Sequence, residues 1–119
     1  MYYNIETNVF VGDPEYAEDK AIELESNLRT ILDSPESIQS NMGVFDSDTD
    51  GLINEILEWL DTQRNVIALQ HDFDEDKIEE DYNILLNSLK FAYIDVTENE
   101  ETIDIEIGGE CPLEYLWLR

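Results

Sequence analysis

Three aspartates at alternate positions, Asp46, Asp48 and Asp50, form the most specific chemical pattern in this chain. Carboxylates spaced in this way serve as Ca²⁺ ligands in the first half of a binding loop, and Gly51 stands where such a loop turns sharply. The loop also needs a bidentate Glu at its twelfth position, and Leu57 occupies that position here. The pattern therefore favours a helix cap, formed by Asp48 or Asp50, over a calcium site.

Side chains that do catalytic chemistry are few. The chain has one histidine, His71, next to Asp72, and one cysteine, Cys111, directly before Pro112. Neither has an identifiable partner for nucleophilic catalysis. The sequence also lacks the phosphate-loop, dinucleotide-binding and zinc-protease motifs. We expect a protein that is not an enzyme and has no cofactor.

Like-charged side chains recur four residues apart, which aligns them in rows on a helix. One row is Glu15, Asp19 and Glu23, with Ile22 among them as an apolar contact, and residues 71–81 hold seven acids and one lysine. Each neighbouring pair costs a helix about 0.2–0.5 kcal/mol. Repelling charges on a rigid scaffold suggest a surface that meets another molecule. The expected contact residues are Glu15, Asp19, Glu23, Asp72, Asp74, Glu75, Asp76, Glu79 and Glu80.

Hydrophobic residues at helical spacing predict the elements that hold these charges. The first helix should run from Pro14 to about Leu32, with Asp13 as its cap, and a second should open at Asp50. Residues 65–70 either extend the second helix or form a short strand. The predicted core stripe of the first helix is Ala17, Ala21, Leu24, Leu28 and Ile31, and that of a third is Ile78, Tyr82, Leu85, Leu86 and Leu89.

Alternating apolar and polar residues predict strands over 2–11, 91–96 and 102–107, and a last strand over 113–118. Gly108-Gly109 is expected to turn the chain before that last strand. The pattern indicates one α+β domain over residues 1–119. It comprises an N-terminal strand, two to three helices and C-terminal antiparallel strands that form one small sheet.

The charge restricts the partners. Thirty acidic against six basic residues give a net charge of -24, while 42% hydrophobic residues indicate a folded core rather than an acidic coil. Such a protein repels nucleic acid and anionic membranes and attracts basic partners. A compact chain of this length has a radius of gyration of roughly 13–14 Å, hence a diameter near ~35 Å. B-DNA carries about 20 charges over that span.

The sequence shows no basic leader followed by an apolar segment and no apolar run near the ~20 residues of a membrane span. A single cysteine excludes an internal disulfide. We therefore expect a cytoplasmic protein.

In length, charge and α+β character the whole chain resembles the bacterial acidic DNA-mimic proteins, above all the small monomeric mimic that binds the histone-like protein HU. The likeness rests on no shared motif, because mimics match the charge pattern of DNA and not one another's sequence. It implies a monomer that occupies the basic DNA-binding surface of a nucleoid-associated or regulatory protein and competes with DNA. No functional residue is carried over from it.

Two alternatives stay open. An immunity or inhibitor protein for a basic nuclease toxin would use the same charge, with exposed Tyr or Trp among the acids as an anchor. A calcium-binding module would use Asp46, Asp48 and Asp50 as a degenerate EF-hand-like loop.

Overall fold

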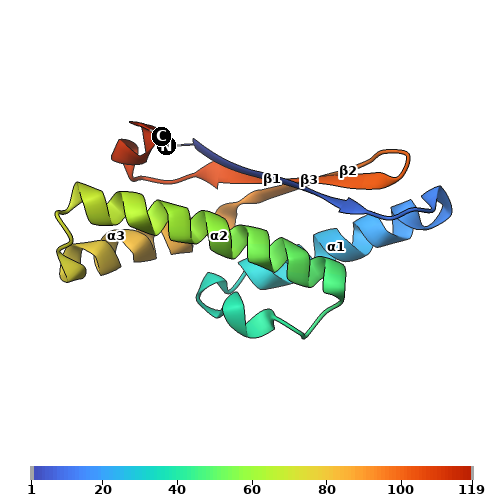
Figure 1. Ribbon diagram of the computed structural model, residues 1–119, viewed down its shortest axis with the longest axis horizontal. Coiled ribbons are helices and arrows are strands. Elements are labelled where there is room, and N and C mark those ends of the chain that lie inside the picture. Colours follow the sequence, from blue (N-terminus) through green and yellow to red (C-terminus); the bar gives the residue numbers. More distant parts are fainter. Residues whose placement is uncertain (1, 119) are drawn as a thin grey trace.

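The computed structural model describes residues 2–118, and only the backbone of residues 117 and 118. It has an α+β fold in which three helices lie against one face of a three-stranded antiparallel sheet (Figure 1). The elements are β1 (Tyr2–Phe10), α1 (Ala17–Leu32), α2 (Ser47–Gln70), α3 (Glu75–Ser88), β2 (Tyr93–Glu98) and β3 (Thr102–Glu110). Short 3₁₀ turns lie at Pro14–Tyr16, Pro35–Ser37, Gln39–Asn41, Leu89–Phe91 and Glu114–Leu118.

The sheet has the order β1-β3-β2, so β3 is central and pairs antiparallel with both neighbours. Ile107 lies opposite Ile5 on one side and Ile94 on the other. Every second residue of β1 and β3 points to the helices, which confirms the predicted alternation. These buried residues are Tyr3, Ile5, Val9, Ile103, Ile105 and Ile107. Among the described elements, no helix covers the opposite face of the sheet (Figure 1).

Helix α1 follows its predicted pattern. Asp13 accepts a hydrogen bond from the backbone N–H of Glu15, and Pro14 opens the 3₁₀ turn that leads into the helix. All five residues of the predicted stripe are buried. The stripe of α3 is confirmed in part, because Ile78, Leu85 and Leu89 are buried while Tyr82 and Leu86 are half-buried.

The start of α2 differs from the prediction. The helix begins at Ser47 rather than Asp50, and its cap is Asp46, which accepts a hydrogen bond from Thr49 N–H. Asp46 has an extended backbone, and its side chain satisfies one of the N–H groups that have no partner at a helix start. The helix can therefore begin three residues before the predicted Asp50. Residues 65–70 continue this helix.

The predicted turn at Gly108-Gly109 is wrong, because both glycines lie within β3. A Cβ on Gly108 would lie 2.5 Å from the Tyr93 hydroxyl oxygen, and one on Gly109 would lie 2.9 Å from that of Tyr3. The two glycines therefore make room for tyrosine rings from the neighbouring strands. Glycine in a strand often marks such a close approach instead of a turn.

The predicted last strand is also wrong, since residues 114–118 form a 3₁₀ turn. Leu113 and Leu116 are both buried, a spacing of three that suits one side of a helical turn and not one face of a strand. The second strand begins at Tyr93 and leaves Phe91 outside it, 87% exposed.

The molecule is longer than the predicted sphere. Its radius of gyration is 15.3 Å and its extents are 51 × 27 × 19 Å. The α2–α3 connection forms one end of the long axis, and the start of α1 with the β2–β3 turn forms the other (Figure 1). Within residues 2–118, no helix combines the length and the apolar composition that crossing a membrane requires.

Candidate functional site

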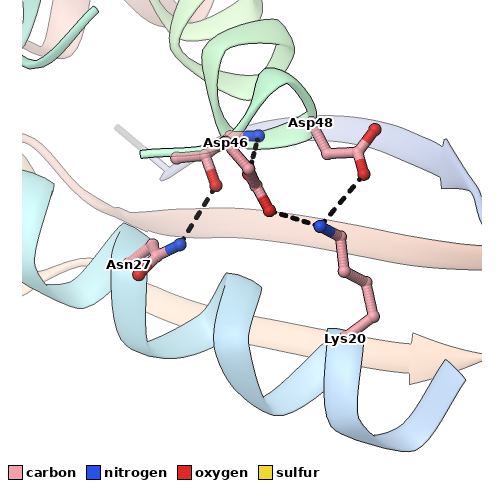
Figure 2. A network of polar contacts seen from close by, with 5 residues as sticks. Lys20, Asn27, Asp46 and Asp48 are labelled. Carbon is pink, nitrogen blue, oxygen red and sulfur yellow. Dashed lines mark hydrogen bonds and ion pairs between the residues drawn. The ribbon is translucent and has the colours of Figure 1, made fainter. Parts of the chain in front are cut away.

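Two of the three aspartates of the calcium-like pattern hold a lysine between them. Figure 2 shows Lys20 of α1 between Asp46 and Asp48, with its Nζ 3.1 Å from Asp48 Oδ2 and in direct contact with Asp46 Oδ2. Burial opposes ionisation of Asp46, but the hydrogen bonds from Lys20 and Thr49 outweigh it and hold the pKa of this carboxyl well below its usual range. Asn27 Nδ2 donates to Thr49 Oγ1 at 3.1 Å, which adds a second link between α1 and α2.

This arrangement removes the loop that the calcium alternative requires. Asp48, Asp50 and Gly51 lie within the first turns of α2, and Asp50 Oδ1 accepts a hydrogen bond from Gly43 N–H at 2.9 Å. The carboxylates therefore do not converge on one point. In the described part of the chain, no three or more His, Cys, Asp or Glu side chains are placed to hold a metal ion. Asp46 starts α2, Asp46 and Asp48 fasten it to α1, and Asp50 binds the loop that precedes it.

His71 contacts Asp81 and not its sequence neighbour Asp72. Its Nε2 lies 2.6 Å from Asp81 Oδ2, and the Tyr115 hydroxyl donates to the same oxygen at 2.6 Å. Burial and the hydrogen bond to Asp81 raise the pKa of Tyr115, while His71 and Tyr115 outweigh burial and lower that of Asp81. The contacts join the C-terminal 3₁₀ turn to α3. Cys111 is buried, and burial raises the pKa of its thiol.

The structure divides the predicted contact residues into two surfaces. The first comprises Glu15, Asp19 and Glu23 around the start of α1, where Ile22 is also 61% exposed. The second lies at the α2–α3 connection and on α3, at the opposite end of the long axis (Figure 1). Its members are all exposed, and they are Asp72, Asp74, Glu75, Asp76, Glu79 and Glu80.

Part of the second surface has a structural explanation. Asp74 caps α3 by accepting hydrogen bonds from the N–H groups of Asp76 and Lys77. Glu75 and Asp76 lie in the first turn of α3, where the helix dipole favours negative charge. Lys77, which is exposed, adds a positive charge within the cluster.

The sheet brings together acids that the sequence pattern did not group. Glu6 of β1 lies opposite Glu106 of β3, and Asp95 of β2 lies opposite Glu106 on its other side. Adjacent strands are about 4.8 Å apart, so three carboxylates form one row across the uncovered face. The next row contains Asp104 between Asn8 and Thr97. The alternation had placed Glu6, Asp104 and Glu106 outward, but their pairing depends on the register.

These two rows line a hollow of about 380 Å³ on the uncovered face. Tyr93, half exposed, precedes Asp95 by two residues on the same face of β2 and donates a hydrogen bond to Glu106 Oε1 at 2.5 Å. That hydrogen bond is the main cause of a raised pKa of the Tyr93 hydroxyl. The three strands contain no Lys, Arg or His, so no cation of the sheet itself compensates the carboxylates.

Comparison with known proteins gives no match to a family model, to a curated protein or to a solved structure. What the protein does is therefore inferred from the charge and geometry of its own residues.

Proposed function

We propose that the protein is a DNA mimic, which binds the basic DNA-binding surface of a nucleoid-associated or regulatory protein such as HU and competes with DNA. The observation that carries this proposal is the linear charge density. A net charge of -24 over a length of 51 Å, that is 51 Å divided by 24, is about one charge per 2.1 Å. B-DNA carries one charge per about 1.7 Å of its axis.

Contacts within the fold engage three of the six basic residues, so few basic side chains remain to repel a basic partner. Lys20 is held by Asp46 and Asp48. Arg29 contacts Asp33 and donates to the backbone carbonyls of Ala92 and Lys90. Arg64 stacks over the Tyr82 ring, 4.8 Å from its centroid.

In this function the protein acts as a cytoplasmic monomer without catalysis or cofactor, and it binds neither nucleic acid nor membrane. The two helical surfaces, around Glu15–Glu23 and around residues 72–80, supply attraction at both ends of the molecule. Because opposite charges dominate the encounter, association is fast at low ionic strength and weakens as salt screens the charges.

Competition with DNA tests the proposal. A labelled DNA duplex bound to purified HU is titrated with this protein while fluorescence anisotropy is followed. We expect displacement of the duplex at roughly 50 mM salt, and direct binding of this protein to HU should weaken steeply by roughly 200 mM. The control is an acidic protein of similar size without elongated shape. If the duplex stays bound to HU and to other nucleoid-associated proteins at low salt, the proposal is wrong.

One observation favours the second candidate, an immunity or inhibitor protein for a basic nuclease toxin. Tyr93 is a half-exposed aromatic residue next to the row of Glu6, Glu106 and Asp95, and aromatic anchors of this kind dominate tight interfaces. Co-expression with a nuclease encoded beside it should then rescue growth, and a Tyr93→Ala variant should rescue less well. Death of the cells with every neighbouring nuclease would exclude this function.

A further inference from the structure

We propose that the uncovered face of the sheet docks arginine side chains of a protein partner. We call this surface, defined by Glu6, Asp95, Asp104 and Glu106, the open sheet face. The inference rests on the proposed function and narrows it, because it moves the centre of contact from the helical surfaces to the sheet and states which cation is recognised.

The carboxylates of the open sheet face repel one another. Like charges directly opposite each other destabilise a sheet, by up to about 1 kcal/mol for a cross-strand pair. The open sheet face has two such pairs, because Glu106 lies opposite both Glu6 and Asp95. Elsewhere Asp46 is compensated by Lys20, and Asp81 accepts a hydrogen bond from the Tyr115 hydroxyl. Among the described residues, no salt bridge reaches the open sheet face. A basic partner would relieve this repulsion.

The open sheet face is hollowed where its carboxylates lie. The hollow of about 380 Å³ lies directly over the acidic rows, and its wall also includes Asn8 and Thr97. Its volume is within the range of about 300–1,000 Å³ that is typical of binding pockets. A flat acidic surface would attract a partner without holding a side chain, whereas a hollow lined by carboxylates and polar groups admits one.

The groups on the open sheet face suit arginine better than lysine. The planar guanidinium of arginine binds carboxylates with two parallel hydrogen bonds and stacks on aromatic rings, which the ammonium of lysine does not match. Glu6, Glu106 and Asp95 offer adjacent carboxylates, and Tyr93 offers a half-exposed ring beside them.

Two exposed aromatic rings flank the open sheet face along β1. The side chains of Tyr2 and Phe10, at the two ends of β1, are each 69% exposed on this side of the sheet. Such rings pack against the methylene stems of long basic side chains. A protein segment that carries arginines therefore matches the surface in its centre and at its margins.

Two charge-matched double variants test the inference. E6Q/E106Q removes two charges from the open sheet face, and E15Q/E23Q removes two from α1. The probe is an arginine nonapeptide, followed by titration calorimetry at low salt. We expect E6Q/E106Q to weaken binding roughly tenfold and E15Q/E23Q by less than about threefold. A lysine nonapeptide should bind the wild-type protein more weakly. Equal losses in both variants, or equal binding of both peptides, would overturn the inference.

Stability provides the folding control. Glutamine at position 106 still accepts the Tyr93 hydrogen bond, and removing the repulsion should leave the melting temperature unchanged or raise it. Weaker binding by a variant that is at least as stable as the wild type cannot arise from unfolding. If E6Q/E106Q melts lower instead, the single variant D95N replaces it, since Asp95 lies in the same row.

The same variants separate this inference from the proposed function. If the wild type does not displace DNA from HU but the peptide results hold, the DNA-mimic proposal fails and the arginine-docking surface stands. If the wild type displaces DNA and E6Q/E106Q competes as well as E15Q/E23Q, the open sheet face is not the centre of contact and this inference fails alone.

Discussion

Asp46 shows how one acid in a highly acidic chain becomes structural. Its Oδ1 accepts the N–H of Thr49 and so caps α2, while its Oδ2 contacts Lys20 of α1. The same side chain therefore starts one helix and joins it to another. The sequence pattern around Asp46 indicated calcium ligands or a cap at Asp48 or Asp50. Spacing within a short segment could not reveal that Lys20, 26 positions before Asp46, contacts these carboxylates.

We predict that D46N lowers the free energy of unfolding by about 1 kcal/mol at pH 7, because asparagine still caps the helix but no longer pairs with Lys20. The D46A variant should lose about 1 kcal/mol more, since it also removes the cap. Urea unfolding followed by circular dichroism measures both losses. Equal losses in D46N and D46A would show that the cap contributes nothing.

The D46N effect should depend on pH in a defined direction. The pKa of Asp46 is lower in the folded protein than its ordinary value of 3.8, so its charge stabilises the fold above that value. The stabilisation is lost as the pH falls from 3.8 toward the folded-state pKa. The difference between wild type and D46N should therefore be constant from pH 7 to about 5 and shrink below about 4. A constant difference down to roughly pH 2 would contradict this assignment.

Among the elements, packing requires glycine at one position, Gly109, and does not require it at another, Gly51. Gly51 lies inside α2, and a Cβ added there would meet no neighbouring atom within 4 Å, so nothing in the packing requires glycine at this position. Gly109 lies in β3 beneath the ring of Tyr3, which is only 4% exposed. The Gly108-Gly109 pair was predicted as a turn because glycine pairs usually mark turns. In the structure both glycines lie within β3, where they leave space for the rings of Tyr93 and Tyr3 on the neighbouring strands.

We predict that G51A raises the free energy of unfolding by about 0.5–1 kcal/mol, because alanine loses less backbone entropy than glycine when a helix forms. G109A should lower it by about 1–3 kcal/mol, since the buried Tyr3 ring cannot move aside without strain. Thermal and urea unfolding of the two variants give the comparison. Similar effects of the two substitutions would mean that the contact between Gly109 and Tyr3 is not tight.

At the scale of the whole molecule, the charge is distributed along an elongated body. The open sheet face and the two helical surfaces each add to it, and the cations Lys20 and Arg29 are bound to acidic groups or backbone carbonyls of the fold. Unbalanced charge of this size opposes the compact state through self-repulsion.

We predict that salt stabilises the free protein. Raising the ionic strength from roughly 0.01 to 0.15 M shortens the screening length from about 30 to about 8 Å, which weakens repulsion between surface carboxylates. The melting temperature, followed by circular dichroism, should rise accordingly. It should rise less for E6Q/E106Q than for wild type, because that variant has less repulsion to screen. A melting temperature independent of salt would show that the carboxylates are compensated within the fold.

The charge, the α+β class, the buried stripe of α1 and the alternation of β1 and β3 could all be predicted from the amino-acid sequence, because they depend on composition and on local periodicity. Three features required the folded structure: the row of Glu6, Glu106 and Asp95, the position of Lys20 between Asp46 and Asp48, and the separation of the two helical surfaces to opposite ends. Each of these depends on strand register or helix packing between residues far apart in the chain. Such non-local contacts follow from the packing of the whole core, and no short segment contains them.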